Sequence, residues 1–332
     1  MQRAEQASYK GVEGMHWLAE DLRARGKKDL QTIVFPESTD ERVVKAVKIM
    51  EEQKLCKPVI VSPASMDPKK KDIFAEMYYQ KRKHRHANVA EVRPLMDDPL
   101  YYAFMMVRAG EADGVVAGAE YTSGAVAKAT FTCFDIDKRA GLVTSCFLML
   151  LPEGSPYGDK GVLLYADCGV IPYPTSEQLA GIASAAAVFY QDVLSIEPRI
   201  AMLSYSTKGS AEGDTINVVR EGLRLVKEKN PNLKIDGELQ ADSALVPDVA
   251  AKKCKGSDVA GKANILVFPN LDAGNIAYKL TERLAGARAV GPLLLGSVEP
   301  VSDLSRGCQV DDIIDCAMLQ AIKAQSIKST KK

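Results

Sequence analysis

The feature that most constrains the fold is an alternation of two kinds of segment along the 332-residue chain. Short apolar runs, such as residues 32–35 before Pro36, are typical of buried strands. Longer segments, such as residues 41–53, repeat their apolar residues at the spacing of a helix. Because strands that alternate with helices form parallel sheets, we expect an α/β protein with helices on both faces of its sheet.

The alternation continues along the rest of the chain. It predicts further strands at 58–61, 113–118, 161–167, 199–203, 265–268 and, as the last one, 293–295. It predicts further helices at 176–190, 214–229 and 275–284, and an amphipathic final helix with one apolar face from 310 to 321. Residues 152–158 are rich in turn formers and interrupt the pattern. The length of the chain suggests two domains.

Composition and charge exclude several classes of function. The chain has 43 basic and 43 acidic residues, so we expect no general binding to nucleic acid, and local basic groups must hold any anionic ligand. The seven cysteines form no CxxC pair and the three histidines are dispersed, which indicates no metal site and reduced thiols in the cytoplasm. No apolar run is long enough to cross a membrane, so we expect a soluble protein.

Three segments have a composition suited to binding an anion. Residues 204–210 combine hydroxyls, a lysine and a glycine after a predicted strand, so Ser206 could help to cradle a phosphate. Residues 270–279 open a predicted helix, whose N-terminus favours anions. The basic run at 81–86 could bind the phosphates of a nucleotide cofactor. Each has an ordinary alternative, namely a polar loop, a capped helix with a solvated lysine, and a solvated helix face.

A fourth segment, residues 302–312, places a serine beside an arginine in a loop that a glycine closes. A carboxylate, Asp312, follows in the first turn of the last predicted helix. Taken alone, Ser305 is more simply explained as a turn residue, and Asp312 as an acid that the helix dipole favours.

This fourth segment resembles the signature of the phosphate acetyltransferase family, also called phosphotransacetylase, within the wider phosphate acetyl/butyryltransferase family. The resemblance is carried by residues 303–308 with Asp312 and by other stretches in the same order along the chain. These stretches are residues 166–168 with 172–179, 201–210, 234–240, 261–264 and 274–280. The likeness extends from about residue 14 to residue 325.

The resemblance implies an α/β fold of two open α/β/α domains with a cleft between them, similar to isocitrate and isopropylmalate dehydrogenases. Domain I would comprise residues 1–140 with residues 301–332, and domain II residues 141–300. Family members are commonly homodimers and are linked in function to acetate kinase. The resemblance implies no permanently bound cofactor and no metal, because coenzyme A is a substrate alongside acetyl phosphate and inorganic phosphate.

The implied reaction is the reversible transfer of an acetyl group between acetyl phosphate and coenzyme A, by direct attack of the thiolate in a ternary complex. The resemblance makes Asp312 the base that removes the thiol proton, a role that requires a partly desolvated carboxylate. Ser305 would donate a hydrogen bond to the developing oxyanion, and Arg306 would bind phosphoryl oxygens. The coenzyme A phosphates are assigned to Arg82 and Lys128. The acyl phosphate is assigned to three residues of the segment 270–279, namely Asn275, Tyr278 and Lys279.

The sequence departs from the family at two positions. Lys128 stands where the family usually has arginine, so the charge is kept but the planar fork is lost. Glu299 stands where the family usually has lysine, which reverses a charge near the expected site. Three other functions stay open: a phosphate butyryltransferase with a larger acyl pocket, a dehydrogenase of the related fold, and a non-catalytic sensor of acyl-coenzyme A.

Overall fold

The computed structural model describes residues 16–330, which form a mixed α/β fold around one continuous sheet. Its strands are β1 (Thr32–Phe35), β2 (Lys57–Ile60), β3 (Gly114–Ala117), β4 (Thr144–Leu150), β5 (Val162–Ala166), β6 (Ile200–Leu203), β7 (Ile235–Leu239), β8 (Ile265–Val267), β9 (Arg288–Leu295) and β10 (Val301–Asp303). They are arranged in the order β2-β1-β3-β10-β9-β4-β5-β8-β6-β7. The expected α/β class is confirmed.

The helices fill the connections between the strands. They are α1 (Trp17–Gly26), α2 (Glu41–Glu52), α3 (Pro68–Arg82), α4 (Val89–Val92), α5 (Pro99–Arg108), α6 (Ser123–Cys133), α7 (Ser176–Phe189), α8 (Asp214–Lys229), α9 (Ala241–Leu245), α10 (Pro247–Lys253), α11 (Leu271–Leu284) and α12 (Val310–Thr330). Side-chain caps fix several starts, because they satisfy N–H groups that lack a partner within the helix. Asp40 caps α2, Thr122 caps α6 and Asn270 caps α11.

The two ends of the sheet are parallel, but its centre is antiparallel. β2, β1, β3 and β10 pair in parallel at one end, and β5, β8, β6 and β7 do so at the other. Between them, β9 pairs antiparallel with β10 and β4, and β4 with β5. The pairing of β4 with β9 is irregular at Phe147, where the register shifts. The prediction of a parallel sheet was wrong for the centre, because the turn-rich loop after β4 returns the chain directly into β5 as a hairpin.

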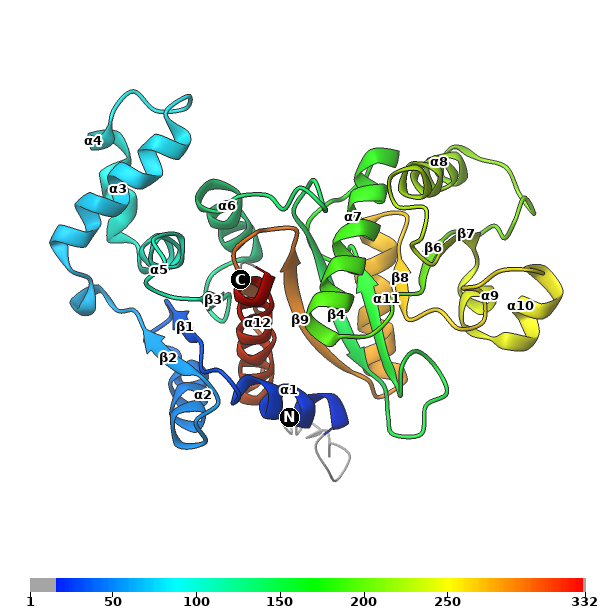
Figure 1. Ribbon diagram of the computed structural model, residues 1–332, viewed down its shortest axis with the longest axis horizontal. Coiled ribbons are helices and arrows are strands. Elements are labelled where there is room, and N and C mark those ends of the chain that lie inside the picture. Colours follow the sequence, from blue (N-terminus) through cyan, green and yellow to red (C-terminus); the bar gives the residue numbers. More distant parts are fainter. Residues whose placement is uncertain (1–15, 331–332) are drawn as a thin grey trace, which may run out of the picture.

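Helices cover both faces of the sheet. Alternate residues of a strand point to opposite faces, and on β4 Leu148 packs in the core that includes α7. Its neighbours Phe147 and Met149 pack in a different core with α11. Figure 1 shows β9 and α12 in the middle of the molecule, with α3, α4 and α5 on one side and α8, α9 and α10 on the other.

The C-terminal helix α12 is more buried than its sequence predicted. It packs against α1, α2, β3 and β9 rather than against a single neighbour. As a result its polar residues Asp315 and Gln320 are both about 1% exposed, and Gln320 donates a hydrogen bond to Ser302 at 2.7 Å. The helix therefore joins the N-terminal elements to the centre of the sheet.

Two other expectations need correction or stay open. The strand expected as the last one, at 293–295, is longer and starts at Arg288, and β10 follows it. The division into domain I and domain II stays a prediction, since the sheet runs through both parts without a break. Among residues 16–330, no helix combines the length and the apolar character that a membrane crossing requires.

Candidate active site

Two loops meet at one edge of the sheet because β3 and β10 are parallel neighbours. Ala117 and Asp303, the last residues of these strands, are direct partners in the pairing. The loop 118–122 after β3 and the loop 304–309 after β10 therefore leave the sheet side by side. In α/β sheets, ligands bind at such carboxyl ends of strands.

The two loops form one wall of a cleft of about 430 Å³. The opposite wall comes from β4, β9, the loop after β5 and the start of α11. The lining residues are Tyr121, Ser123, Phe147, Cys168, Gly169, Asn275, Tyr278, Pro292, Leu304, Ser305 and Arg306. A larger hollow of about 560 Å³, between α7, α12 and residues 135–140, contains none of the predicted site residues.

Four of the predicted site residues meet in the cleft, namely Ser305, Arg306, Asn275 and Tyr278. The Ser305 hydroxyl accepts the N–H of Gly307 at 3.2 Å, so its own proton can be donated to a ligand. The Asn275 amide donates to the carbonyl of Cys168 at 3.1 Å. Tyr278 stacks on an aromatic ring of β4, with 4.0 Å between ring centroids. The cleft thus pairs a polar wall with an aromatic one.

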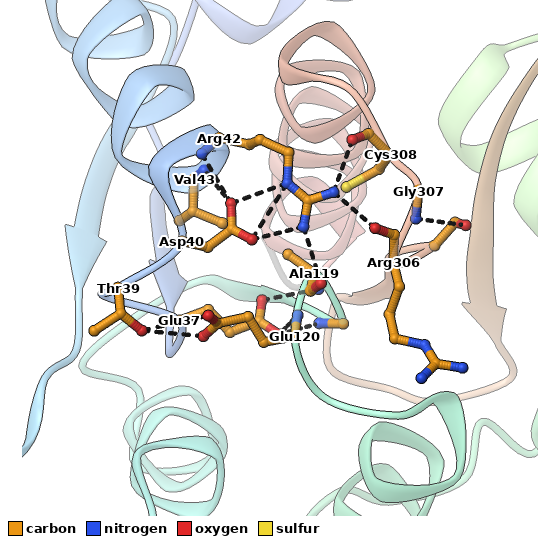
Figure 2. A network of polar contacts seen from close by, with 12 residues as sticks. Glu37, Thr39, Asp40, Arg42, Val43, Ala119, Glu120, Arg306, Gly307 and Cys308 are labelled. Carbon is orange, nitrogen blue, oxygen red and sulfur yellow. Dashed lines mark hydrogen bonds and ion pairs between the residues drawn. The ribbon is translucent and has the colours of Figure 1, made fainter. Parts of the chain in front are cut away.

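Arg42, at the start of α2, fixes the loop that carries Ser305 and Arg306. Its guanidinium donates to the carbonyls of Arg306 at 2.8 Å, Cys308 at 3.0 Å and Ala119 at 3.0 Å, and it pairs with Asp40. Figure 2 shows these contacts, with the Arg306 side chain extending away from them. Arg42 therefore holds both loops of this wall and leaves the guanidinium of Arg306 to face a ligand.

Glu37, which follows β1, holds the loop after β3. Its carboxylate is 2% exposed and accepts backbone N–H groups from four consecutive residues, of which Ala119 and Glu120 are labelled in Figure 2. One oxygen accepts from Gly118 at 2.9 Å, Glu120 at 2.7 Å and Tyr121 at 2.9 Å, and the other accepts from Ala119 at 3.1 Å. The loop is thus fixed through its backbone, whatever its side chains are.

Asp167, at the end of β5, holds the opposite wall in the same manner. Its carboxylate is buried and accepts the N–H groups of Gly169 at 2.8 Å, Val170 at 3.1 Å and Ile171 at 2.9 Å. The hydroxyl of Ser145 donates to it as well. Each wall of the cleft therefore depends on one buried carboxylate.

Asp312 does not line the cleft in this structure. Its side chain is 18% exposed, and one oxygen accepts from Nε of Arg288, on β9, at 2.9 Å. The other oxygen accepts the backbone N–H of Gln309 at 2.8 Å. Arg288 also pairs with Asp315 at 2.8 Å. Burial lowers the pKa of Arg288, but these two carboxylates more than offset this effect. Asp312 is thus engaged by an arginine that the sequence did not single out, and its role as a desolvated base in the cleft stays a prediction.

The residues assigned to coenzyme A also lie outside the cleft lining. Arg82 ends α3, and Lys128 lies on α6, a neighbouring helix. Lys128 is exposed, and Arg82 is partly buried. Because α6 also supplies Ser123 to the cleft, the two cations lie on elements that adjoin its polar wall.

Three other singled-out residues are not among those that line the cleft. Lys279 is exposed, with its ammonium group 4.8 Å from the centroid of the preceding tyrosine ring. Ser206 is fully buried, and its hydroxyl donates to Glu238 at 2.8 Å. Glu299 pairs with Arg108 at 3.0 Å, so a local partner neutralises the reversed charge.

Sequence reasoning missed Tyr121, Ser123 and the buried Asp303. The signal that could have found them is the end of the predicted strand 113–118. A loop that follows this strand lies at the carboxyl edge of the sheet, and so does Asp303 at the end of β10.

The fold and the cleft define an α/β protein whose cleft is lined by a serine, an arginine and the first residue of α6. Residues 17–321 match the family described as phosphate acetyl/butaryl transferase. The chain belongs to this family, which confirms the resemblance seen in the sequence.

Named relatives agree with this assignment. The chain is 42% identical over 329 residues to the phosphate acetyltransferase of Acetivibrio thermocellus, covering 93% of this chain and 99% of the relative. It is 38% identical to that of Thermoanaerobacterium thermosaccharolyticum over 327 residues, with coverages of 93% and 99%.

Solved structures agree as well. A phosphotransacetylase from Streptococcus pyogenes has a TM-score of 0.83 at 35% identity, covering 94% of this chain and 98% of that chain. A structure from Salmonella typhimurium described as a 4-hydroxythreonine-4-phosphate dehydrogenase has a TM-score of 0.51 at 12% identity, covering 88% and 99%. The second likeness concerns the fold alone and agrees with the expected relation to dehydrogenases.

Proposed function

We propose that this protein is a phosphate acetyltransferase, which transfers an acetyl group reversibly between acetyl phosphate and coenzyme A. The observation that carries the proposal is the cleft in which Ser305 and Arg306 face Asn275 and Tyr278. This arrangement occurs in a chain whose named relatives are phosphate acetyltransferases. Coenzyme A is a substrate in this reaction, and no permanently bound cofactor takes part.

The chemistry needs a thiolate, an oxyanion donor and a group that holds phosphate. A free thiol, with a pKa of about 8.5, attacks a carbonyl poorly until it loses its proton. We assign proton removal to Asp312, whose carboxylate pairs with Arg288. Ser305 donates to the oxyanion, and the guanidinium fork of Arg306 binds the leaving phosphate. Because Asp312 does not line the cleft here, this assignment requires the first turn of α12 to shift when coenzyme A binds.

The remaining assignments follow the walls of the cleft. Arg82 and Lys128 would bind the phosphates of coenzyme A beside α6, and Asn275 and Tyr278 would contact the acyl phosphate. The ammonium group of Lys279 lies over the Tyr278 ring, so it could contact the acyl phosphate only by moving away from this ring. The role of Ser206 stays a prediction without support from its buried position.

The test is thioester formation from acetyl phosphate and coenzyme A. We expect Asp312→Asn to reduce kcat by about 100-fold to 10,000-fold and Ser305→Ala by about 100-fold. Asp311→Asn is the matched control, because its side chain is 69% exposed and pairs only with Arg23 among the neighbours described. The acetyl assignment is checked by the ratio of rates with acetyl and butyryl phosphate, since a larger acyl pocket would favour the second.

A wild-type protein that binds coenzyme A without transferring the acetyl group would refute the proposal in favour of the sensor. Equal rates for Asp312→Asn and Asp311→Asn would show that Asp312 is not the base. The assignment of the reaction as acetyl transfer would then still stand.

We further infer that the protein acts in the cytoplasm as a homodimer, in sequence with an acetate kinase. All seven cysteines are buried free thiols, which fits a reducing compartment. α11 exposes an apolar stripe of Ile276, Leu280 and Leu284 at 56%, 51% and 81%. An apolar stripe that is exposed among the described residues is suited to cover by a second copy. Sedimentation of the wild type and of Leu280→Glu measures whether this face joins two chains.

A further inference from the structure

Two carboxyl groups flank the loop of Ser305 and Arg306, and their environments differ. Asp312 follows the loop and is paired with the guanidinium of Arg288. Asp303 precedes the loop and, within residues 16–330, is not in an ion pair. When two acids near one site have opposite environments, the pair can divide the roles of base and acid.

The surroundings of Asp303 offer its carboxyl group almost no compensation for burial. The side chain is 1% exposed, and Oδ1 has no hydrogen-bond partner among the residues described. This oxygen lies against Gly118, where an added Cβ would come within 2.2 Å of it. The N–H groups of Gly118 and the next three residues cannot serve it, because Glu37 accepts all four.

Burial consequently raises the pKa of Asp303 to about 7, and the charge of Glu37 adds to the rise. The Ser123 hydroxyl and the Leu304 N–H lower it in part. The neighbouring helix α12 faces β10 with a neutral group, the Gln320 amide that donates to Ser302. A carboxyl group in this environment carries a proton in much of the population at neutral pH, and it can give that proton up.

α6 packs against β10, the strand that ends at Asp303, and this places Ser123 as the nearest candidate to link the buried acid with the cleft. Ser123 is the first residue of α6 and lines the cleft together with Leu304, Ser305 and Arg306. The first N–H groups of a helix lack partners in its own backbone and attract anions. The phosphoryl group of an acyl phosphate held by Arg306 and the start of α6 would therefore lie beside the Ser123 hydroxyl.

Transfer from acetyl phosphate needs an acid as well as a base. A bond forms between the sulfur and the acetyl carbon, and the bond from that carbon to the bridging oxygen breaks. Phosphate that left without a proton would be a trianion, which is strongly basic and a poor leaving group near neutral pH. Protonation of the bridging oxygen as the bond breaks releases hydrogen phosphate instead, a favourable case for general acid catalysis.

We propose that Asp303 is the proton donor for the leaving phosphate and acts through the hydroxyl of Ser123. The thiol proton passes to Asp312, the Ser123 proton passes to the bridging oxygen, and the Asp303 proton replaces it on Ser123. Asp312 then loses a proton to water and Asp303 regains one, so the cycle changes no net charge. In the reverse direction the Asp303 carboxylate accepts the proton of hydrogen phosphate. The inference rests on the proposed acetyl transfer and adds its second proton step.

The experiment measures kcat and KM between about pH 5.5 and pH 9 for the wild type, Asp303→Asn, Ser123→Ala and Ser123→Thr. Asn has the shape of the neutral acid but holds no transferable proton. We expect the wild-type kcat to fall as the pH rises through about 7, because the acid form is lost. Asp303→Asn and Ser123→Ala should each lower kcat by about 100-fold or more and abolish this fall, with both KM values within about twofold. Ser123→Thr keeps a hydroxyl and should restore the rate and the pH profile.

The outcomes distinguish a failure of the proton transfer from Asp303 through Ser123, here called the relay, from a failure of acetyl transfer as a whole. If the wild type transfers no acetyl group, the proposed function fails and the relay fails with it. If the wild type is active but Asp303→Asn keeps its rate at every pH, only the relay is overturned. A variant that raises KM yet keeps the pH profile would give Asp303 a structural role and also overturn it. Should Asp303→Asn not fold, Ser123→Ala and Ser123→Thr decide, because Ser123 is exposed at the cleft.

Discussion

Replacing Glu37 by glutamine changes one oxygen of the carboxylate that holds the loop after β3 into an NH₂ group. When the glutamine amide is oriented with its oxygen at the position of Oε1, this oxygen still accepts from Gly118, Glu120 and Tyr121. The acceptor is then neutral, so each of these hydrogen bonds is weaker. Hydrogen bonds to a charged group contribute about 1 kcal/mol more than neutral ones, and an unsatisfied buried N–H costs about 1–3 kcal/mol. With the Ala119 N–H left unsatisfied as well, we expect a loss of about 4–6 kcal/mol in the free energy of unfolding.

Urea unfolding near pH 7 measures this loss. The slope m of the free energy of unfolding against urea concentration is compared between variants, because a change in m indicates a change in the unfolded state. Glu120→Gln is the matched control, because it lies in the same loop but its side chain contacts only the hydroxyl of Thr39 among the residues described. The control should change stability by less than about 0.5 kcal/mol. Equal stability losses in the two variants would refute the claim that Glu37 anchors the loop.

Three further predictions follow from the same region. Arg42→Lys keeps the charge but cannot reach three carbonyls at once, so we expect a loss of about 2 kcal/mol in urea unfolding and a lower kcat. Gly118→Ala should cost more than about 3 kcal/mol and abolish transfer, whereas Gly110→Ala, also at positive φ but with open space around it, should cost about 1 kcal/mol. Because folding raises the pKa of Asp303 to about 7, the native state is penalised increasingly as pH rises from about 4 to 7. Asp303→Asn should therefore gain stability relative to the wild type by up to about 4 kcal/mol at pH 8 and little near pH 4, as measured by urea unfolding.

The elements with a strong local pattern could be predicted closely from the sequence. The helix expected at 214–229 is α8 with the same bounds, and the strand at 32–35 is β1. The centre of the sheet could not be predicted, because strand direction depends on which segments become neighbours. β4 shows this most clearly: its residues form an apolar run without any period, and a hairpin with β5 sets its direction.

The residues of the candidate site could be predicted where they belong to a sequence motif. They could be predicted less well where burial in the folded chain determines their environment. Ser305 and Arg306 lie in the cleft, as the resemblance implied, although the chemical roles of both stay predictions. The pairing of Asp312 with Arg288 joins residues 24 positions apart on different elements, and no local pattern marks it. Asp303 belongs to the same motif, yet its significance comes from the lack of a hydrogen-bond partner for Oδ1 among residues 16–330, which only packing reveals.

The irregular pairing of β4 with β9 has a mechanical consequence. This pair joins the two parallel ends of the sheet, and it combines a register shift at Phe147 with Pro292, which has no N–H to donate. A ladder that is interrupted resists bending less at the interruption than along its regular part, so the β4–β9 pair should bend most easily at Phe147, and we call this point the seam. Phe147 and Pro292 are also part of the cleft. A bend at the seam therefore changes the width of the cleft directly, and the stiffness of the sheet sets how far its two walls can separate.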